Sequence, residues 1–281
     1  MMPGCAIAAV PSRLQAMYPL IAQANAAWSF SDRLRMDYIG SAYRVRRDSD
    51  NAELDIGFVD NAVDVAALGA FVGAASGHVV RAYDQSGNGR DLAQTTVTLQ
   101  PWVVDAGVLS QAGALPAARF NPAVRVTNLK RADSFDVTGS QAWTIATLWR
   151  PQDTGFLIVM GSSGTTRAIY KSDQVYGNQS TGGYVTFDAS NPVWRADVVK
   201  HPPAAQVLSC TRRSNLRDSL VVDSRSGGLN IVGSSTVGSR YDDTSQLTGY
   251  LSTLVLFGSE VAAQATTTLE RYLMDRRALT A

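Results

Sequence analysis

The stretch Trp143-Thr144-Ile145-Ala146-Thr147-Leu148-Trp149 decides the class of fold. It is rich in β-branched and aromatic residues, which favour extended backbone, and its two tryptophans fall on one face of a strand. Similar runs occur on both sides of it, separated by clusters of Gly, Ser, Asn and Asp that are typical of turns. Further strands are predicted at residues 43–47, 78–83, 156–160, 167–170, 184–188, 207–212, 219–223 and 250–257.

Two helical segments complete this pattern. Val65–Val72 follows Asp64, an N-cap residue, and stops at Gly73. Near the end of the chain, Ser259 is expected to cap a second helix with an apolar stripe at helical spacing. We therefore predict an all-β fold, a β-sandwich or jelly roll, with a short helix near 65–72 and a C-terminal helix near 260–277. The Ala-rich, Pro-interrupted residues 1–25 are predicted to form an N-terminal arm, followed by one domain over residues 26–281.

The composition excludes several other classes of protein. Among the 25 basic and 24 acidic residues, only three are Lys and only three are Glu. Both are strong helix formers, so their scarcity disfavours a helical bundle. The net charge of +1 gives no general attraction to nucleic acid. No apolar run approaches the roughly 18 residues that a membrane-spanning helix needs. We predict no nucleic-acid partner and no membrane insertion.

The chain has two cysteines and two histidines. These are too few for a disulfide framework or a His-rich metal site.

Two motifs carry a family resemblance. The first is Ala42-Tyr43-Arg44-Val45-Arg46-Arg47-Asp48-Ser49-Asp50-Asn51-Ala52-Glu53-Leu54-Asp55-Ile56-Gly57-Phe58, and the second is Tyr83-Asp84-Gln85-Ser86-Gly87-Asn88-Gly89-Arg90-Asp91-Leu92-Ala93-Gln94. Both resemble the N-terminal half of the α-L-arabinofuranosidase B-type catalytic domain (glycoside hydrolase family 54), and both are similar to a module of tailed-phage and prophage virion proteins. The resemblance covers about residues 28–102 and the closing segment 249–273. It implies a concanavalin A-like β-sandwich.

The second motif has a structural and a metal-binding interpretation. Its two glycines can take positive φ, and its short polar side chains can bond to local backbone, as a tight turn requires. The same spacing also resembles the start of a calcium loop, but the twelfth position, where a bidentate acid is expected, is Thr95. We favour the structural turn, with calcium as the alternative, and expect no other cofactor or metal. The polar residues concerned are Asp84, Ser86, Asn88 and Asp91.

The carboxylates that the resemblance implies are not found. Glycoside hydrolysis uses two positioned carboxyl groups, and the resembled family has a Glu nucleophile and an Asp acid/base in the second half of its domain. The corresponding segments, 161–165 and 234–238, contain no carboxylate, and no Glu lies between residues 54 and 259. Asp242 and Asp243 follow shortly and can substitute only in a rearranged loop. We therefore assign no catalytic residue.

A Ser–His–Asp site is not supported either, because His201 is expected in an exposed loop.

These observations favour a non-catalytic protein. We predict a phage or phage-like virion accessory protein (spike, fibre-base, decoration or tail-tip subunit) that binds host surface glycan. Residues 1–25 would contact other virion proteins, and a homo-oligomer is expected. With no signal peptide, it would be made in the host cytoplasm and located in the virion.

Sugar binding uses aromatic rings and hydrogen-bonding groups. The candidate residues, all expected in loops, are Tyr176, Trp194, Tyr241, Asp242 and Asp243. The alternative is a glycoside hydrolase related to α-L-arabinofuranosidases that uses Asp residues in place of the missing Glu.

Overall fold

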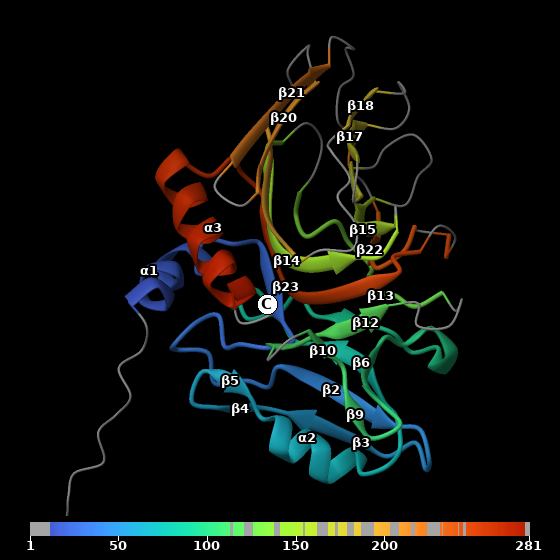
Figure 1. Ribbon diagram of the computed structural model, residues 1–281. Helices are drawn as coiled ribbons and strands as arrows, with labels where there is room; N and C mark the ends of the chain where they lie inside the picture. Colours follow the sequence, from blue (N-terminus) through green and yellow to red (C-terminus); the bar gives the residue numbers. More distant parts are fainter. Residues whose placement is uncertain are drawn as a thin grey trace, which may run out of the picture.

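The computed structural model describes residues 12–278 with internal gaps. The gaps are 113–114, 121–125, 138–140, 154, 162–167, 172–173, 179–182, 187–193, 203–207, 215–216, 224–230, 232, 241 and 244–245. The described residues form an all-β fold with few helices, as predicted (Figure 1). Within this part of the chain no helix is both long and apolar enough to cross a membrane.

The first half of the chain consists of short antiparallel strands and one helix. β2 (Tyr43–Arg47) lies between β3 (Glu53–Ile56) and β6 (Gly77–Ala82). Helix α2 (Val65–Val72) covers this group beside β3 (Figure 1). The other elements of this half are β1 (Ala26–Ser29), β4 (Phe58–Val59), β5 (Ala62–Val63), β7 (Leu92–Ala93), the 3-10 turn η1 (Val97–Leu99), β8 (Trp102–Asp105), β9 (Val108–Leu109), β10 (Gln111–Ala112), β11 (Leu115–Pro116), β12 (Ala118–Phe120) and β13 (Leu129–Arg131).

The second half is built around β14 (Trp143–Pro151), the strand that contains the stretch quoted first. It pairs antiparallel with β19 (Arg195–His201) on one side and β23 (Gly249–Phe257) on the other. β23 also pairs with β1 and β12, which joins the two ends of the chain in one sheet. The remaining strands are β15 (Phe156–Met160), β16 (Ala168–Lys171), β17 (Gln174–Asn178), β18 (Gly183–Thr186), β20 (Leu208–Ser214), β21 (Arg217–Asp223) and β22 (Ser235–Val237).

Strand β14 is buried on both faces. Trp143, Ile145 and Trp149 point into the core between the layers. Ala146 and Leu148 point the other way, into a second core beneath the helices. Because side chains alternate along a strand, this double burial explains why almost every residue of the stretch is apolar or β-branched.

Two helices cover the outer face of this sheet. α3 (Ala263–Ala278) packs on β19 and β14, and α1 (Ser12–Ile21) packs on α3 (Figure 1). Met17 and Ile21 of α1 are buried in the second core. The described part of the predicted arm therefore packs against its own chain, while residues 1–11 lie outside the described residues.

The helix predictions hold for α2 and need a correction for α3. α2 has the predicted bounds, and the Asp64 carboxylate accepts a hydrogen bond from the Ala67 amide at 2.8 Å. α3 begins at Ala263 rather than near residue 260. Ser259 does not cap it, because it lies four residues before the helix begins, and its carbonyl accepts a hydrogen bond from the Thr144 hydroxyl on β14.

Two segments predicted as loops are strands. His201 ends β19, where only 4% of its surface is exposed, and its ring stacks on Trp143 at 5.2 Å between centroids. The prediction of an exposed loop there is therefore wrong. Tyr176 lies within β17, although its side chain is outside the described residues.

Candidate functional site

The turn between β6 and β7 is organised around the carboxylate of Asp84. Its Oδ1 accepts hydrogen bonds from the amides of Ala27 and Ser86, both at 2.9 Å. Its Oδ2 accepts from the Ser86 hydroxyl at 2.8 Å and the Arg90 amide at 2.9 Å. A carboxylate offers about four acceptor positions. Four hydrogen bonds from the protein itself therefore occupy the acceptor positions of the Asp84 carboxylate.

The other polar residues of this turn also bond to backbone. Asp91 accepts from the Asp84 amide at 2.9 Å, and the Asn88 amide group donates to the Ala24 carbonyl at 2.9 Å. Gly87 and Gly89 both have positive φ. The described residues contain no group of three or more His, Cys, Asp or Glu side chains that could hold a metal ion. This geometry favours the structural-turn interpretation, in which the motif ties the turn to β1.

A partly exposed carboxylate with two fixed partners lies in the loop between β22 and β23. The Asn128 amide group donates to Asp243 Oδ1 at 2.7 Å. Lys130 Nζ lies 2.7 Å from Oδ1 and 2.8 Å from Oδ2 of the same carboxylate. The Asp243 side chain is 34% exposed. A cation and a hydrogen-bond donor at this range fix the orientation of the carboxylate.

Buried amides support this carboxylate from behind. Asn128 is fully buried, and its amide group also donates to the Ser239 hydroxyl at 3.0 Å. Gln94 donates to the Asn128 side-chain oxygen, and Gln100 donates to the Gln94 carbonyl at 2.9 Å. Gln94 is the last residue of the second sequence motif, so this network connects that motif to the Asp243 loop. We define Asp243, Asn128, Lys130 and Gln94 as the Asp243 cluster.

Of the five predicted sugar-binding residues, the structure brings together only Asp242 and Asp243. Asp242 is 34% exposed, and its Oδ2 lies 3.6 Å from Arg240 Nε. Trp194 is 7% exposed and packs in the second core, which leaves little of its ring for a ligand. Tyr241 and the side chain of Tyr176 lie outside the described residues.

The polar supports of Asp243 were missed by sequence reasoning. One weak signal is available, because Lys130 is one of only three lysines in the chain. Its partner is more than 100 residues away, and only the pairing of β13 with β22 brings the two together.

Some carboxyl groups outside the Asp243 cluster have lowered pKa values because arginines donate hydrogen bonds to them. Such bonds lower the pKa of Asp50, Asp55 and Asp133, and the pKa of Asp50 falls to about 2. These three carboxylates therefore belong to ion pairs, which does not suit the proton donor of a catalytic pair.

Fold and site together define an all-β sandwich with a partly exposed carboxylate whose orientation is fixed by Asn128 and Lys130. The family model of the α-L-arabinofuranosidase B catalytic domain matches residues 21–125. No curated protein sequence matches the chain significantly.

Solved structures resemble almost the whole chain. A GH54 α-L-arabinofuranosidase soaked with a cyclic sulfate inhibitor has a TM-score of 0.68 and 14% identity, over 94% of this chain and 65% of that one. A mutant GH54 enzyme soaked with 4-nitrophenyl α-L-arabinofuranoside has a TM-score of 0.67 at 14% identity, with the same coverage. An arabinofuranosidase complexed with arabinofuranosyl-α-1,2-xylobiose has a TM-score of 0.65 at 15% identity. The chain spans 65% of the length of these structures.

These findings correct the functional prediction. They support a GH54-like domain and contradict the prediction of a non-catalytic virion accessory protein, which is therefore wrong. Nothing among them relates the chain to a virion or to host attachment. These findings do not test the expected contacts of residues 1–25 with other virion proteins or the expected virion location, which stay predictions. The alternative, a hydrolase that uses Asp residues, fits better.

Proposed function

We propose that this chain is a glycoside hydrolase catalytic domain that acts on α-L-arabinofuranosides with aspartates as its carboxylates. The observation that carries the proposal is the Asp243 carboxylate, held by Asn128 and Lys130 in a rim loop of a sandwich that resembles arabinofuranosidases over 94% of its length. The absence of Glu from residues 54–259 restricts the carboxylates of this part of the chain to aspartates.

Asp243 has the features of the anionic member of a catalytic pair. Glycoside cleavage develops positive charge on the sugar ring, and an ionised carboxylate stabilises that charge or attacks it. Lys130 and Asn128 hold the Asp243 carboxylate in one orientation, so little reorganisation is needed during the reaction. Because the side chain is one-third exposed, a substrate can reach it.

Asp242 supplies the second carboxyl group. The neighbouring side chain of Arg240 lies at 3.6 Å, a looser contact than the one that Lys130 makes with Asp243. A sugar that covers Asp242 would displace water from it. Desolvation raises the pKa of a carboxyl group, which would allow it to protonate the leaving oxygen.

The test compares two aspartates with the same backbone conformation. Asp243 and Asp60 have φ of 60° and 53°, values that Asn adopts readily. Asp243→Asn removes the negative charge at the site, whereas Asp60→Asn does so in the exposed turn between β4 and β5. We expect Asp243→Asn to lower kcat/KM for 4-nitrophenyl α-L-arabinofuranoside by about 100-fold or more, which is the range for a positioned catalytic carboxyl.

Asp60→Asn should retain wild-type activity. Asp242→Asn should lower activity toward substrates with poor leaving groups more than toward the aryl glycoside, because nitrophenolate needs little protonation. Wild-type activity in Asp243→Asn would remove this aspartate from the mechanism.

A further inference from the structure

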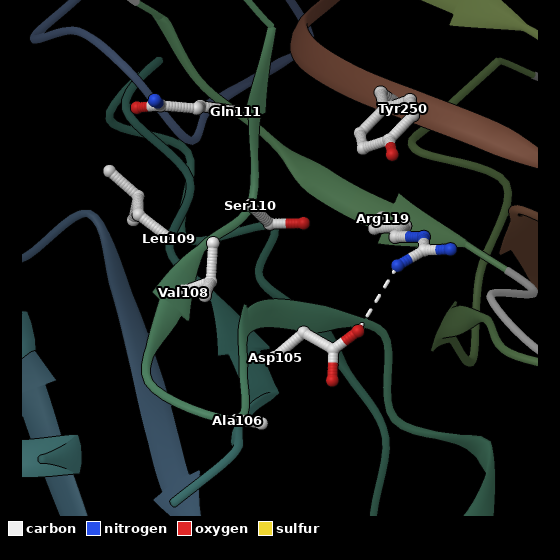
Figure 2. Close-up of a pocket in the computed structure, with 8 residues that line it drawn as sticks. All are labelled: Asp105, Ala106, Val108, Leu109, Ser110, Gln111, Arg119 and Tyr250. Atoms are coloured by element: carbon white, nitrogen blue, oxygen red, sulfur yellow. Dashed lines mark hydrogen bonds and ion pairs between the residues drawn. The ribbon is translucent and has the colours of Figure 1, made fainter. Parts of the chain in front are cut away.

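A second polar pocket lies away from the Asp243 cluster. It has a volume of about 570 Å³ and is formed by β8, β9, β12 and the start of β23 (Figure 2). Its lining residues are Asp105, Ala106, Val108, Leu109, Ser110, Gln111, Arg119 and Tyr250. None of them belongs to the Asp243 cluster, so the hydrolase proposal does not account for this pocket.

One wall of the pocket offers both donors and acceptors. Arg119 Nη1 lies 3.2 Å from Asp105 Oδ2, and both side chains are partly exposed. The Arg119 guanidinium also lies over the Tyr250 ring, 6.0 Å from its centroid. Figure 2 shows the Asp105 carboxylate, the Ser110 and Tyr250 hydroxyls and the Arg119 guanidinium turned toward the same space.

Ser110 gives this wall a buried polar group that is available to a ligand. Only 7% of the residue is exposed, and its backbone is fixed by a hydrogen bond to the Val103 carbonyl at 2.8 Å and one from the Ala117 amide at 2.9 Å. With its backbone fixed in this way, Ser110 keeps its place in the pocket wall, where its hydroxyl can donate a hydrogen bond to a ligand or accept one from it.

The opposite wall is apolar. Val108 is 69% exposed and Leu109 is half-buried, and both project from the short strand β9. Ala106 adds its methyl group from a turn with positive φ. An exposed valine beside a polar wall gives the pocket two faces of opposite character.

We propose that this pocket binds one neutral saccharide unit of a longer chain. A sugar ring has the same two-faced character, because its hydroxyls need paired donors and acceptors while its C–H face packs on apolar surface. The Asp105–Arg119 pair supplies a planar acceptor beside a planar donor, which suits neighbouring hydroxyls. The pair has no net charge. An anion that approached Arg119 would also approach the Asp105 carboxylate, so its net electrostatic attraction would be small.

Such a site would serve polymer binding rather than bond cleavage. A saccharide unit bound here would retain its chain near the sandwich and raise the effective concentration of other units at the rim. The effect would be absent for small aryl glycosides. This inference goes beyond the proposed activity, and its test does not require turnover.

The experiment is calorimetric titration of the full chain carrying Asp243→Asn, to prevent hydrolysis. The probes are arabinotriose, xylotriose and inorganic phosphate. Ser110→Ala and Val108→Ser are introduced separately. The matched control is Val59→Ser, because Val59 is also an exposed valine of a two-residue strand. We expect at least one trisaccharide to bind, and each pocket variant to weaken binding roughly five- to tenfold, the loss of one hydrogen bond or one apolar contact.

The control should match the parent chain. Identical isotherms for the pocket variants and Val59→Ser would overturn the proposal, as would the absence of trisaccharide binding. Phosphate binding that depends on Ser110 without any saccharide binding would also overturn it, and would make the pocket an anion site.

Discussion

At the scale of single residues, His201 is a buried imidazole with an altered protonation equilibrium. It is 4% exposed and stacked on Trp143. Burial lowers its pKa from 6.5 to about 4. The folded protein therefore holds this histidine neutral, while the unfolded chain binds a proton below about pH 6.5. Between these two pKa values the unfolded state binds more protons, so stability is lost as the pH falls.

His201→Phe should remove this pH dependence. In the wild type, the free energy of unfolding should fall by roughly 3 kcal/mol as the pH is lowered from 6.5 to 4, because of this residue alone. The variant keeps the ring contact with Trp143 and should show a flatter profile. Urea titrations at several pH values measure the difference. His78→Phe is a suitable control, because His78 also lies against a tryptophan in a strand. Parallel profiles for wild type and His201→Phe would contradict this assignment.

The same residues show what the sequence could and could not predict. Asp242 and Asp243 could be nominated because they follow shortly after residues 234–238, the segment that the family resemblance matches to the acid/base position. Asn128 could not, since 115 positions separate it from Asp243 and only strand pairing joins them. His201 was misplaced because Pro202 and Pro203 follow it. Prolines are typical of loops, but they also end strands, and here Pro202 directly follows β19.

At the scale of elements, the β22–β23 loop depends on one glycine. Gly238 has a φ of 90°, a conformation that L-residues with a side chain rarely adopt. A Cβ atom there would overlap the Phe120 ring and lie 3.1 Å from the Thr127 carbonyl. Its amide donates to Leu157, and its carbonyl accepts from Leu247. This glycine therefore sets the path of the chain toward Asp243.

Gly238→Ala should destabilise the protein by about 3 kcal/mol or more, from backbone strain and overpacking together. Activity should fall further than the folded fraction explains, because the carboxylate loop is displaced. Gly57→Ala is the control, since nothing lies within 4 Å of its added Cβ and stability should hardly change. Chemical denaturation and aryl-glycoside assays measure both effects. Equal stabilities for the two variants would refute the role of Gly238.

The start of α3 shows tertiary contacts overriding a local signal. Ser259 followed by an apolar stripe predicts an N-cap there. Instead, the Thr144 hydroxyl of β14 donates to the Ser259 carbonyl and accepts from the Val261 amide. These bonds hold residues 259–261 against the sheet, and α3 begins at Ala263. In α2, the Asp64 carboxylate accepts a hydrogen bond from the Ala67 amide and caps the helix as predicted.

At the scale of the whole molecule, one buried ion pair joins the two ends of the described chain. Arg276 of α3 makes two contacts with the Asp32 carboxylate, one of them from Nε to Oδ2 at 2.9 Å. The Asp32 side chain is 5% exposed, and Ser31 donates to it at 2.6 Å. A charge buried this deeply is costly once its partner is removed.

Arg276→Met should therefore cost about 3 kcal/mol or more of unfolding free energy, because it leaves Asp32 without its cation. The double variant Asp32→Asn, Arg276→Met should cost less than the sum of the single changes, since neither charge is then left alone. A double-mutant cycle from urea titrations measures the coupling. Strict additivity would show that the pair does not join the helix to the sheet.

The whole fold was more predictable than the function. Runs of β-branched and aromatic residues between turn clusters predict the β-sandwich, because the long strands β14, β19 and β23 are buried on both faces. Composition alone does not give the function, because a chain with few Glu residues can still supply carboxylates from its 21 Asp residues. The Asp243 carboxylate is held in place by Asn128 and Lys130, which lie more than 100 positions away in the sequence.

The most direct test of this account is the release of 4-nitrophenol from 4-nitrophenyl α-L-arabinofuranoside by the purified full chain, with Asp243→Asn assayed in parallel. We predict release that is linear in protein concentration for the wild type and lower by about 100-fold or more in the variant. A folded wild-type chain that leaves the substrate intact would contradict the proposed hydrolase function.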